Sequence, residues 1–206
     1  NYGETSETQV NPALSLGAVT LSKKGYSAGL WLGTARRSGS MTERFINYFP
    51  VGQDAYELLG NPLIKPETNN QADLNLSYKS PKTIISADIF ASLVNDYISA
   101  VIDTSLKPRL MGPGVRRFVN IKSAFRTGIE LSWKQTIMSV LQQKVAIAYT
   151  YGQNTVTDEP LPEIAPMEFR YSLTGAFFKE KLRPSLHLRH TLEQNRVSSE
   201  FGETKT

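Results

Sequence analysis

The connections between strand-like segments alternate between short and long, and this alternation is the feature that most constrains the fold. Tight polar turns join four pairs of segments, at 23–25, 80–82, 135–139 and 179–181. Long connections separate the pairs, at 38–67, 99–116 and 153–166, and a final polar run covers 195–206. Short turns at one end and long loops at the other are typical of an up-and-down transmembrane β-barrel. A soluble β-sandwich places loops of either length at either end.

Eight segments alternate between apolar and polar residues with a period of two, which predicts strands. In 71–79, the clearest case, an apolar series that ends at Tyr78 alternates with a polar series that ends at Lys79. The eight expected strands are 12–22, 26–35, 71–79, 83–98, 118–134, 140–152, 167–177 and 184–194. Residues 40–49 have weak helical spacing inside the longest connection, so we expect no firm helix there.

Composition permits a membrane protein without a membrane helix. The 206 residues include no apolar run of about 18, so no transmembrane helix is expected. A spanning β-strand needs only about 9–11 residues, of which alternate ones face lipid, and a mean hydropathy of −0.30 is compatible with that. There is no cysteine, so no disulfide framework holds the fold. The net charge of +4 is dispersed and includes no basic cluster with interleaved aromatic residues, which argues against nucleic-acid binding.

Charges within the expected strands indicate the environment of the polar face. In a small, filled soluble barrel, each unpaired charge would cost several kcal/mol. A polar lumen removes that cost, and we therefore expect five charged residues to face a lumen: Asp88, Glu130, Glu168, Arg170 and Arg189. Aromatic residues gather near segment ends, as in interfacial girdles, although aromatic residues also favour strands in general. The girdle candidates are Tyr26, Tyr78, Tyr97, Trp133, Tyr149 and Tyr151.

Two phrases in the first long loop resemble a known family. They are RSGSMTERF at 37–45 and GNPLIKPE at 60–67, the latter placed just before the strand from Gln71. Together they resemble the β-barrel of TonB-dependent outer-membrane receptors, with Leu63-Ile64 where Asn-Leu is commoner. The stretches 118–130 and 161–166 resemble later strand openings of the same family. The resemblance covers essentially the whole chain.

The resemblance implies an all-β fold: an antiparallel up-and-down transmembrane barrel, here a partial set of about eight strands with long extracellular loops. Residues 1–206 would form a C-terminal part of the barrel domain, with the plug domain and the remaining strands elsewhere in the same protein. The polar residues at both ends, 1–4 and 201–206, also indicate that both ends are cuts. The implied function is active uptake of a metal chelate across the outer membrane of a Gram-negative bacterium. The ligand would be a ferric siderophore, haem, cobalamin or another metal complex. The implied partners are outer-membrane lipid and, through the plug, the TonB complex; no cofactor is implied.

Under this interpretation, the long loops and the upper lumen wall carry ligand recognition. Arginine suits carboxylate, catecholate or hydroxamate groups through charge-assisted hydrogen bonds. We expect the connection 36–67 to contribute most, with Arg44 and Tyr48 favoured. Arg37 and Arg117 could instead hold lipid at the barrel rim. The ligand-binding candidates are Arg36, Arg37, Arg44, Tyr48, Tyr97, Arg116, Arg117 and Tyr151.

Two alternatives stay open on the sequence. A complete eight-stranded outer-membrane barrel with an adhesive or structural role would pair its first and last strands. An enzyme is not expected. The two histidines, His187 and His190, lie at odd spacing on one strand, and no nucleophile-elbow phrase, phosphate loop or metal-site spacing is present.

Overall fold

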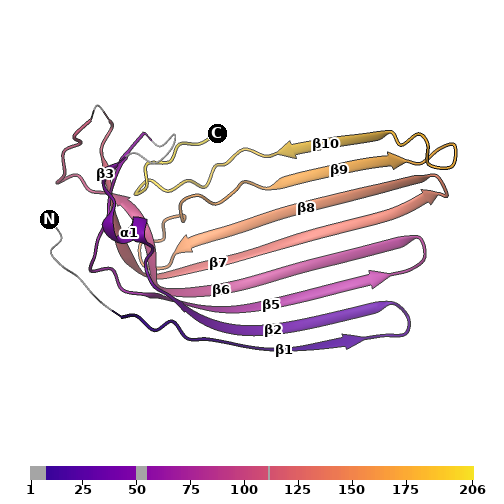
Figure 1. Ribbon diagram of the computed structural model, residues 1–206, viewed down its shortest axis with the longest axis horizontal. Helices are drawn as coiled ribbons and strands as arrows, with labels where there is room; N and C mark the ends of the chain where they lie inside the picture. The colour runs from indigo at the N-terminus through magenta and orange to yellow at the C-terminus, as the bar shows by residue number, and fades with distance from the viewer. Residues whose placement is uncertain (1–7, 50–54, 111) are drawn as a thin grey trace.

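A computed structural model describes residues 8–49, 55–110 and 112–206. Within these ranges eight long strands form one antiparallel sheet in the order β1-β2-β5-β6-β7-β8-β9-β10, each strand beside its predecessor (Figure 1). The strands are β1 (Ala13–Leu21), β2 (Tyr26–Arg37), β5 (Glu67–Lys79), β6 (Thr83–Ile102), β7 (Val115–Met138), β8 (Leu141–Asn154), β9 (Glu168–Gly175) and β10 (Ser185–Thr191). All eight expected strands and the all-β class are confirmed.

Strand lengths depart from expectation at two places. The turn predicted at 135–139 is wrong, because β7 runs on to Met138 and only residues 139–140 turn. β7 and β8 stay paired through this stretch, where Gln135 lies opposite Gln143 and Gln143 Nε2 donates to Gln135 Oε1 at 2.9 Å. At the other end, β6 and β7 have 20 and 24 residues, against the about 9–11 that span a bilayer. Both strands are therefore about twice as long as a bilayer-spanning strand, and their extra length lies at the long-loop end.

The longest connection is more ordered than the sequence indicated. It contains the short helix α1 (Met41–Phe45) and the short strands β3 (Asn47–Phe49) and β4 (Glu57–Leu59). The helix was missed although its start has a capping box, in which Ser40 and Glu43 satisfy each other's backbone N–H groups. β4 pairs with the upper end of β7 in parallel, from Glu57↔Val115 to Leu59↔Arg117. The loop thus adds a strand to the wall, an exception to the expected purely antiparallel meander.

The sheet is open. β1 and β10 lie at its opposite edges, and no pairing joins them in the described part of the chain (Figure 1). A complete eight-stranded barrel would need that ladder, so this alternative is wrong. Each edge strand presents unpaired backbone groups, which cannot face hydrocarbon without a partner strand.

The apolar positions form continuous rows across one face of the sheet. One row pairs Leu30 with Leu74, Leu74 with Ile89, Ile89 with Ile129, and Ile129 with Tyr149. Leu76 and Leu131, one row nearer the short turns, are 41% and 39% exposed, so they pack into no dry core, as expected. From the row of Tyr26 to the row of Thr34 the band extends about 26 Å along the strands, close to the apolar band of outer-membrane barrels.

The small buried core lies instead at the long-loop end. Of the described hydrophobic residues, those under 10% exposed are in the upper parts of β6 and β7 or in the loops above them. They are Leu58, Ile64, Val94, Ile98, Ala100, Val115, Ala124 and Leu161. Among the described residues no helix has the length and hydropathy to cross a membrane. The molecule therefore has a two-faced wall and a packed rim.

Candidate functional site

The polar face of the wall is built from cross-strand rows. Asp88 lies opposite Glu130, Glu130 opposite Ala148, and Ala148 opposite Glu168. Asn75 Nδ2 completes the row by donating to Asp88 Oδ1 at 2.7 Å. A hollow of about 350 Å³ lies over this row and is lined by Asp88, Glu130, Lys144, Glu168 and Arg170, among others. The register thus brings the five charged residues expected in a lumen onto one face, although their exposure to a lumen stays a prediction.

Three charged residues, Glu168, Arg170 and Arg189, form an ion-pair triad on β9 and β10 at the edge of the sheet. Arg170 lies directly opposite Arg189, an arrangement of like charges that destabilises a ladder when uncompensated. The Glu168 carboxylate accepts hydrogen bonds from both guanidinium groups and bridges them. Both arginines keep more than 60% of their side chains exposed, so they remain accessible from the polar side.

The two phrases of the first long loop meet in space and form what we call the rim cluster: residues 37–45, 60–67 and Asn120. The Arg37 guanidinium binds both oxygens of Glu43, at 2.9 and 3.1 Å, and donates Nε–H to Glu67 Oε1 at 2.8 Å. The other oxygen of Glu67 accepts the backbone N–H of Ile98 at 2.8 Å. One arginine therefore ties the end of β2, helix α1 and the start of β5 to β6.

The Glu43 carboxylate is held in its charged form. Burial alone would raise its pKa, but hydrogen bonds from Arg37 and from Ser40 outweigh burial and hold the pKa below its usual value. The side chain is 17% exposed, so solvent screens this ion pair less than a surface pair. At neutral pH, the charged Glu43 and Arg37 side chains therefore hold helix α1 against the end of β2.

The glycine-asparagine-proline phrase supplies close approach and turn geometry. A Cβ on Gly60 would lie 2.6 Å from the Arg44 carbonyl carbon, so only glycine fits there. Asn61 Oδ1 accepts Leu63 N–H at 3.0 Å, its Nδ2 donates to Phe118 O at 3.2 Å, and Arg44 Nη2 donates to Pro62 O at 3.0 Å. The phrase that carries the resemblance therefore positions the loop on the barrel wall.

Asn120 fixes the other end of this phrase. Its Oδ1 accepts Lys65 N–H at 2.7 Å, and its Nδ2 donates to Lys65 O at 2.9 Å and to Asp96 O at 2.7 Å. A side chain that mimics a backbone strand in this way holds 60–67 against β6 and β7. Asn120 stands in one of the later stretches of the resemblance, so separated phrases act on one junction.

The structure does not gather the eight ligand-binding candidates into one pocket. Arg37 and Arg44 have partners in the rim cluster, and Arg109 lies over the Tyr48 ring with 4.1 Å between guanidinium carbon and centroid. Arg116 is 5% exposed, lies 4.1 Å from the Tyr56 ring and 3.6 Å from the Phe201 ring, and donates Nε–H to Phe201 O. Arg116 thus anchors the end of the chain to the rim.

The remaining candidates separate by face. Arg36 and Tyr151 follow the alternation of Leu32 and Ile147, so they leave the wall on its apolar side. The Tyr151 ring is covered by Arg196 at 4.1 Å. Arg117 is exposed, and Tyr97 is half-buried in upper β6. A ligand-binding role for all eight stays a prediction, and the geometry favours structural roles for Arg37 and Arg116.

Two residues that the sequence did not single out matter here, Glu57 and Arg126. Glu57 is 2% exposed and accepts the backbone N–H groups of Arg109 and Leu110 at 2.9 and 2.5 Å, which fixes the second long loop. Arg126 lies on the polar face opposite Ser92, and its shielded Nε lacks a hydrogen-bond partner among the described residues. Arg126 is therefore an additional candidate for ligand contact, and no sequence signal distinguished it from other strand arginines.

Comparison with known proteins agrees with this architecture. A family model described as "TonB dependent receptor-like, beta-barrel" matches residues 2–206, whereas no curated protein matches. Solved structures with a similar fold include the copper transporter OprC, at TM-score 0.72 and 25% identity over 86% of this chain. Others are the siderophore receptor PirA from Pseudomonas aeruginosa (0.67, 16%, 85%) and the FrpB iron transporter from Neisseria meningitidis (0.59, 17%, 89%). This chain spans 26%, 32% and 27% of those three proteins, respectively.

Proposed function

Because the chain belongs to the TonB-dependent receptor-like β-barrel family, we propose that it forms part of the wall of an outer-membrane receptor that imports a metal complex. The barrel is completed by strands elsewhere in the same protein, and a plug domain elsewhere fills it. The short turns face the periplasm and the long loops face the outside. TonB supplies the energy through the plug.

The observation that carries this proposal is the two-faced open wall. An exposed apolar face suits lipid, and a charged face with a hollow suits a polar lumen. Two unpaired edges need further strands before the sheet can stand in a bilayer. A soluble sheet of this size would bury one face, and this sheet buries neither between its short turns and the loop end.

The substrate class is supported by the neighbours and by two arginines, one on the polar face and one at the rim. The copper transporter supports a copper species, and the siderophore receptors support a ferric chelate. Arg126 on the polar face and the exposed Arg117 at the rim suit anionic oxygen groups on a chelator. We therefore propose a metal complex with carboxylate, catecholate or hydroxamate groups, and a copper complex as the second candidate.

The test is metal uptake by cells that carry or lack the full-length gene. Under the proposal, complementation restores accumulation of either iron or copper, measured by mass spectrometry, under limitation for that metal. Deletion of the TonB system or collapse of the proton motive force abolishes the gain. Equal accumulation of both metals with and without the gene would refute the transport function.

The recognition residues are tested by ligand binding to whole cells. Arg126→Ala is expected to weaken binding by about 1.5–3 kcal/mol, as for a lost charged hydrogen bond. Arg183→Ala, in the short turn between β9 and β10, is the matched control and should leave affinity unchanged. Deletion of 48–56, of which 50–54 lie outside the described residues, tests the expected contribution of Tyr48 and its loop. Unchanged affinity at normal expression would assign that loop a structural role.

A further inference from the structure

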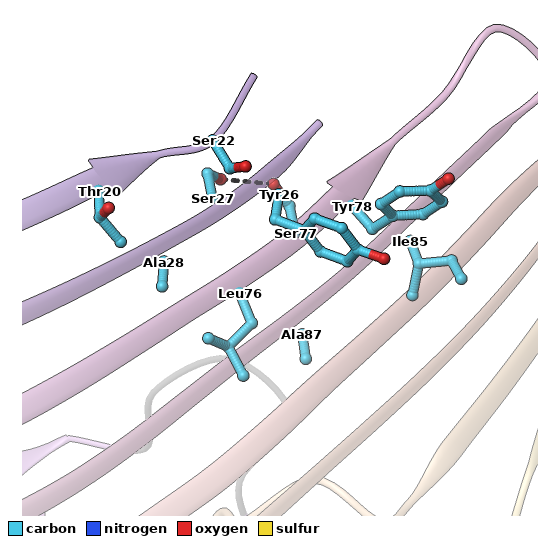
Figure 2. A pocket seen from close by; sticks show the side chains of 10 residues that line it. All are labelled: Thr20, Ser22, Tyr26, Ser27, Ala28, Leu76, Ser77, Tyr78, Ile85 and Ala87. Atoms are coloured by element: carbon cyan, nitrogen blue, oxygen red, sulfur yellow. Dashed lines mark hydrogen bonds between the residues drawn. The ribbon is translucent and has the colours of Figure 1, made fainter. Parts of the chain in front are cut away.

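A shallow groove crosses the apolar face next to the short turns of β1, β2, β5 and β6 (Figure 2). Its volume is about 410 Å³. One cross-strand row, Thr20 to Ala28 to Leu76 to Ala87, supplies three small side chains that leave the groove open. The next row supplies larger side chains, Tyr26, Tyr78 and Ile85, which bound the groove on the turn side.

The tyrosine pair places this groove at an interface. The Tyr26 and Tyr78 rings lie 4.7 Å apart at an interplanar angle of 36°, and Tyr26 is 57% exposed. Exposed amphipathic rings at the end of an apolar strand band sit at headgroup level. The groove therefore begins in hydrocarbon and ends where headgroups begin.

The charged residues beyond the two tyrosines are almost all positive. We define the short-turn end as residues 22–26, 79–84, 134–144 and 175–184. It contains nine Lys or Arg residues and one acidic residue, Glu180, which is paired with Arg183. At the long-loop end, by contrast, arginines are interleaved with carboxylates such as Glu43, Glu57 and Glu67. A net positive end beside an apolar groove favours an anionic amphiphile.

Three of these lysines lie in the turns next to the groove, and Lys23 and Lys24 directly follow Ser22, which lines it. Lys23, Lys24 and Lys82 are exposed and belong to two turns that touch. The backbone N–H of Lys79 donates to Gly25 O at 2.8 Å, and a Cβ on Gly25 would lie 2.1 Å from Lys79 O. Gly25 also has φ +86°, which favours glycine. The glycine thus holds the Lys23-Lys24 turn against the turn that carries Lys82.

We propose that this groove and these lysines form a binding site for an anionic phospholipid of the periplasmic leaflet. An acyl chain lies along Ala28, Leu76 and Ala87, and the headgroup phosphate pairs with Lys23, Lys24 and Lys82. The site rests on the proposed function in one respect: the apolar face must contact a bilayer, with the short turns on the periplasmic side.

The experiment is native mass spectrometry of the full-length protein titrated with phosphatidylglycerol, phosphatidylcholine or lipid A. We expect phosphatidylglycerol to bind more tightly than phosphatidylcholine. Replacing Lys23, Lys24 and Lys82 together by Gln should weaken phosphatidylglycerol binding about tenfold or more and leave phosphatidylcholine unchanged. Ala87→Phe should displace the bound lipid by filling the groove.

Two matched controls use the same chemistry elsewhere. Ala91→Phe lies on the same strand and face, in a second groove of about 570 Å³ that is farther along the strands from the Lys23-Lys24 and Lys82 turns, and should leave phosphatidylglycerol binding intact. Gln at Lys65, Lys107 and Lys122, three exposed lysines of the long-loop end, should also have no effect. The proposal is overturned if the control variants weaken phosphatidylglycerol binding as much as the test variants do. It is also overturned if the protein binds the two phospholipids with equal affinity, or if it binds only lipid A.

The lipid measurement does not depend on the transported ligand. Folding of every variant is checked by heat-modifiable gel mobility, and Ala87→Phe is read only where that mobility is normal; the lysine variant remains as an independent test. If the full-length protein binds phosphatidylglycerol and phosphatidylcholine equally but still takes up metal, the lipid site is wrong and the transport function stands. If the protein prefers phosphatidylglycerol but takes up no metal, the transport function is wrong and the lipid site stands.

Discussion

The wall and the rim of this molecule are held together in different ways. Between the short turns and the row of Thr34, backbone ladders join the strands, and most large apolar side chains stay at least partly exposed. In the rim, by contrast, Leu161, Glu57 and Val115 are fully buried, and side chains bind backbone groups of distant segments. The apolar face of the wall stays exposed in this chain, whereas the rim packs against itself.

This difference teaches how each region should respond to mutation. Under the proposed function, the face on which a wall residue lies decides its tolerance, because one face would meet lipid and the other a polar lumen. In the rim, local geometry decides, because close approaches and buried hydrogen bonds leave no room for change. The predictions below test that contrast in the full-length protein.

The largest effect is expected at adjacent wall positions on opposite faces. Leu131→Lys places a charge on the lipid side at mid-band and should cost roughly 2–4 kcal/mol, which lowers the yield of folded barrel. Glu130→Ser, on the polar side, should assemble normally. Heat-modifiable mobility of outer-membrane fractions measures both variants. Equal losses would contradict the assignment of faces.

A smaller effect is expected from adding one methyl group in the rim. Gly60→Ala would place a Cβ 2.6 Å from the Arg44 carbonyl carbon, and the resulting backbone shift should cost about 1–3 kcal/mol. Limited proteolysis should then cleave the 38–66 connection while the barrel stays intact. In the wall, Gly33→Ala meets no atom closer than 3.7 Å and serves as the control. Equal protease resistance of both variants would contradict the packing described for the rim.

The same contrast explains what the sequence could and could not predict. Wall strands were predictable because a period of two sorts residues such as Asp73 and Leu74 onto opposite faces wherever one face is apolar. The turn expected at 135–139 is wrong because Gln135, Thr136 and Ser139 are typical turn residues, although Gln135 and Thr136 here accept hydrogen bonds from Gln143 and Gln142 across the strands. Polar composition alone does not end a ladder.

The rim was predictable only through the family resemblance. No local signal places Arg37 beside Glu67, 30 residues away, or Arg116 beside Phe201, 85 residues away. The capping box at Ser40 and Glu43 is a local sequence signal that marks the start of α1. Ligand-binding candidates were chosen by residue type and loop position, and several of these arginines have structural partners that only the tertiary fold reveals.

A third prediction concerns acid sensitivity of the rim. Because the folded-state pKa of Glu43 is lowered, its ion pair stabilises the rim above the unfolded-state pKa near 4.5. That stabilisation is lost as pH falls through the lower folded-state pKa. Glu43→Gln should cost about 1.5 kcal/mol at neutral pH and remove the acid dependence.

Proteolysis of the 38–66 connection as a function of pH measures this effect. The wild-type rim should become sensitive below pH 4–5, and the Glu43→Gln rim should be sensitive to the same degree throughout. Glu180→Gln at the short-turn end, which pairs with Arg183 on the surface, is the control and should leave the pH profile unchanged. An identical acid transition in wild type and Glu43→Gln would assign it to another group.

The smallest effect should come from one side-chain hydrogen bond removed in each region. In the wall, Ser27 and Ser77 hydroxyls lie 2.7 Å apart on the polar face, where lumen water can replace the lost partner. Ser77→Ala should therefore cost less than about 0.5 kcal/mol. In the rim, Asn61→Ala removes an exposed bond from Leu63 N–H and a part-buried bond to Phe118 O, and should cost about 1–2 kcal/mol. Urea unfolding in micelles, followed with protease protection of the loop, measures both. If Ser77→Ala lowers the free energy of unfolding as much as Asn61→Ala does, water does not reach the polar face. The wall and the rim then do not differ in their access to water.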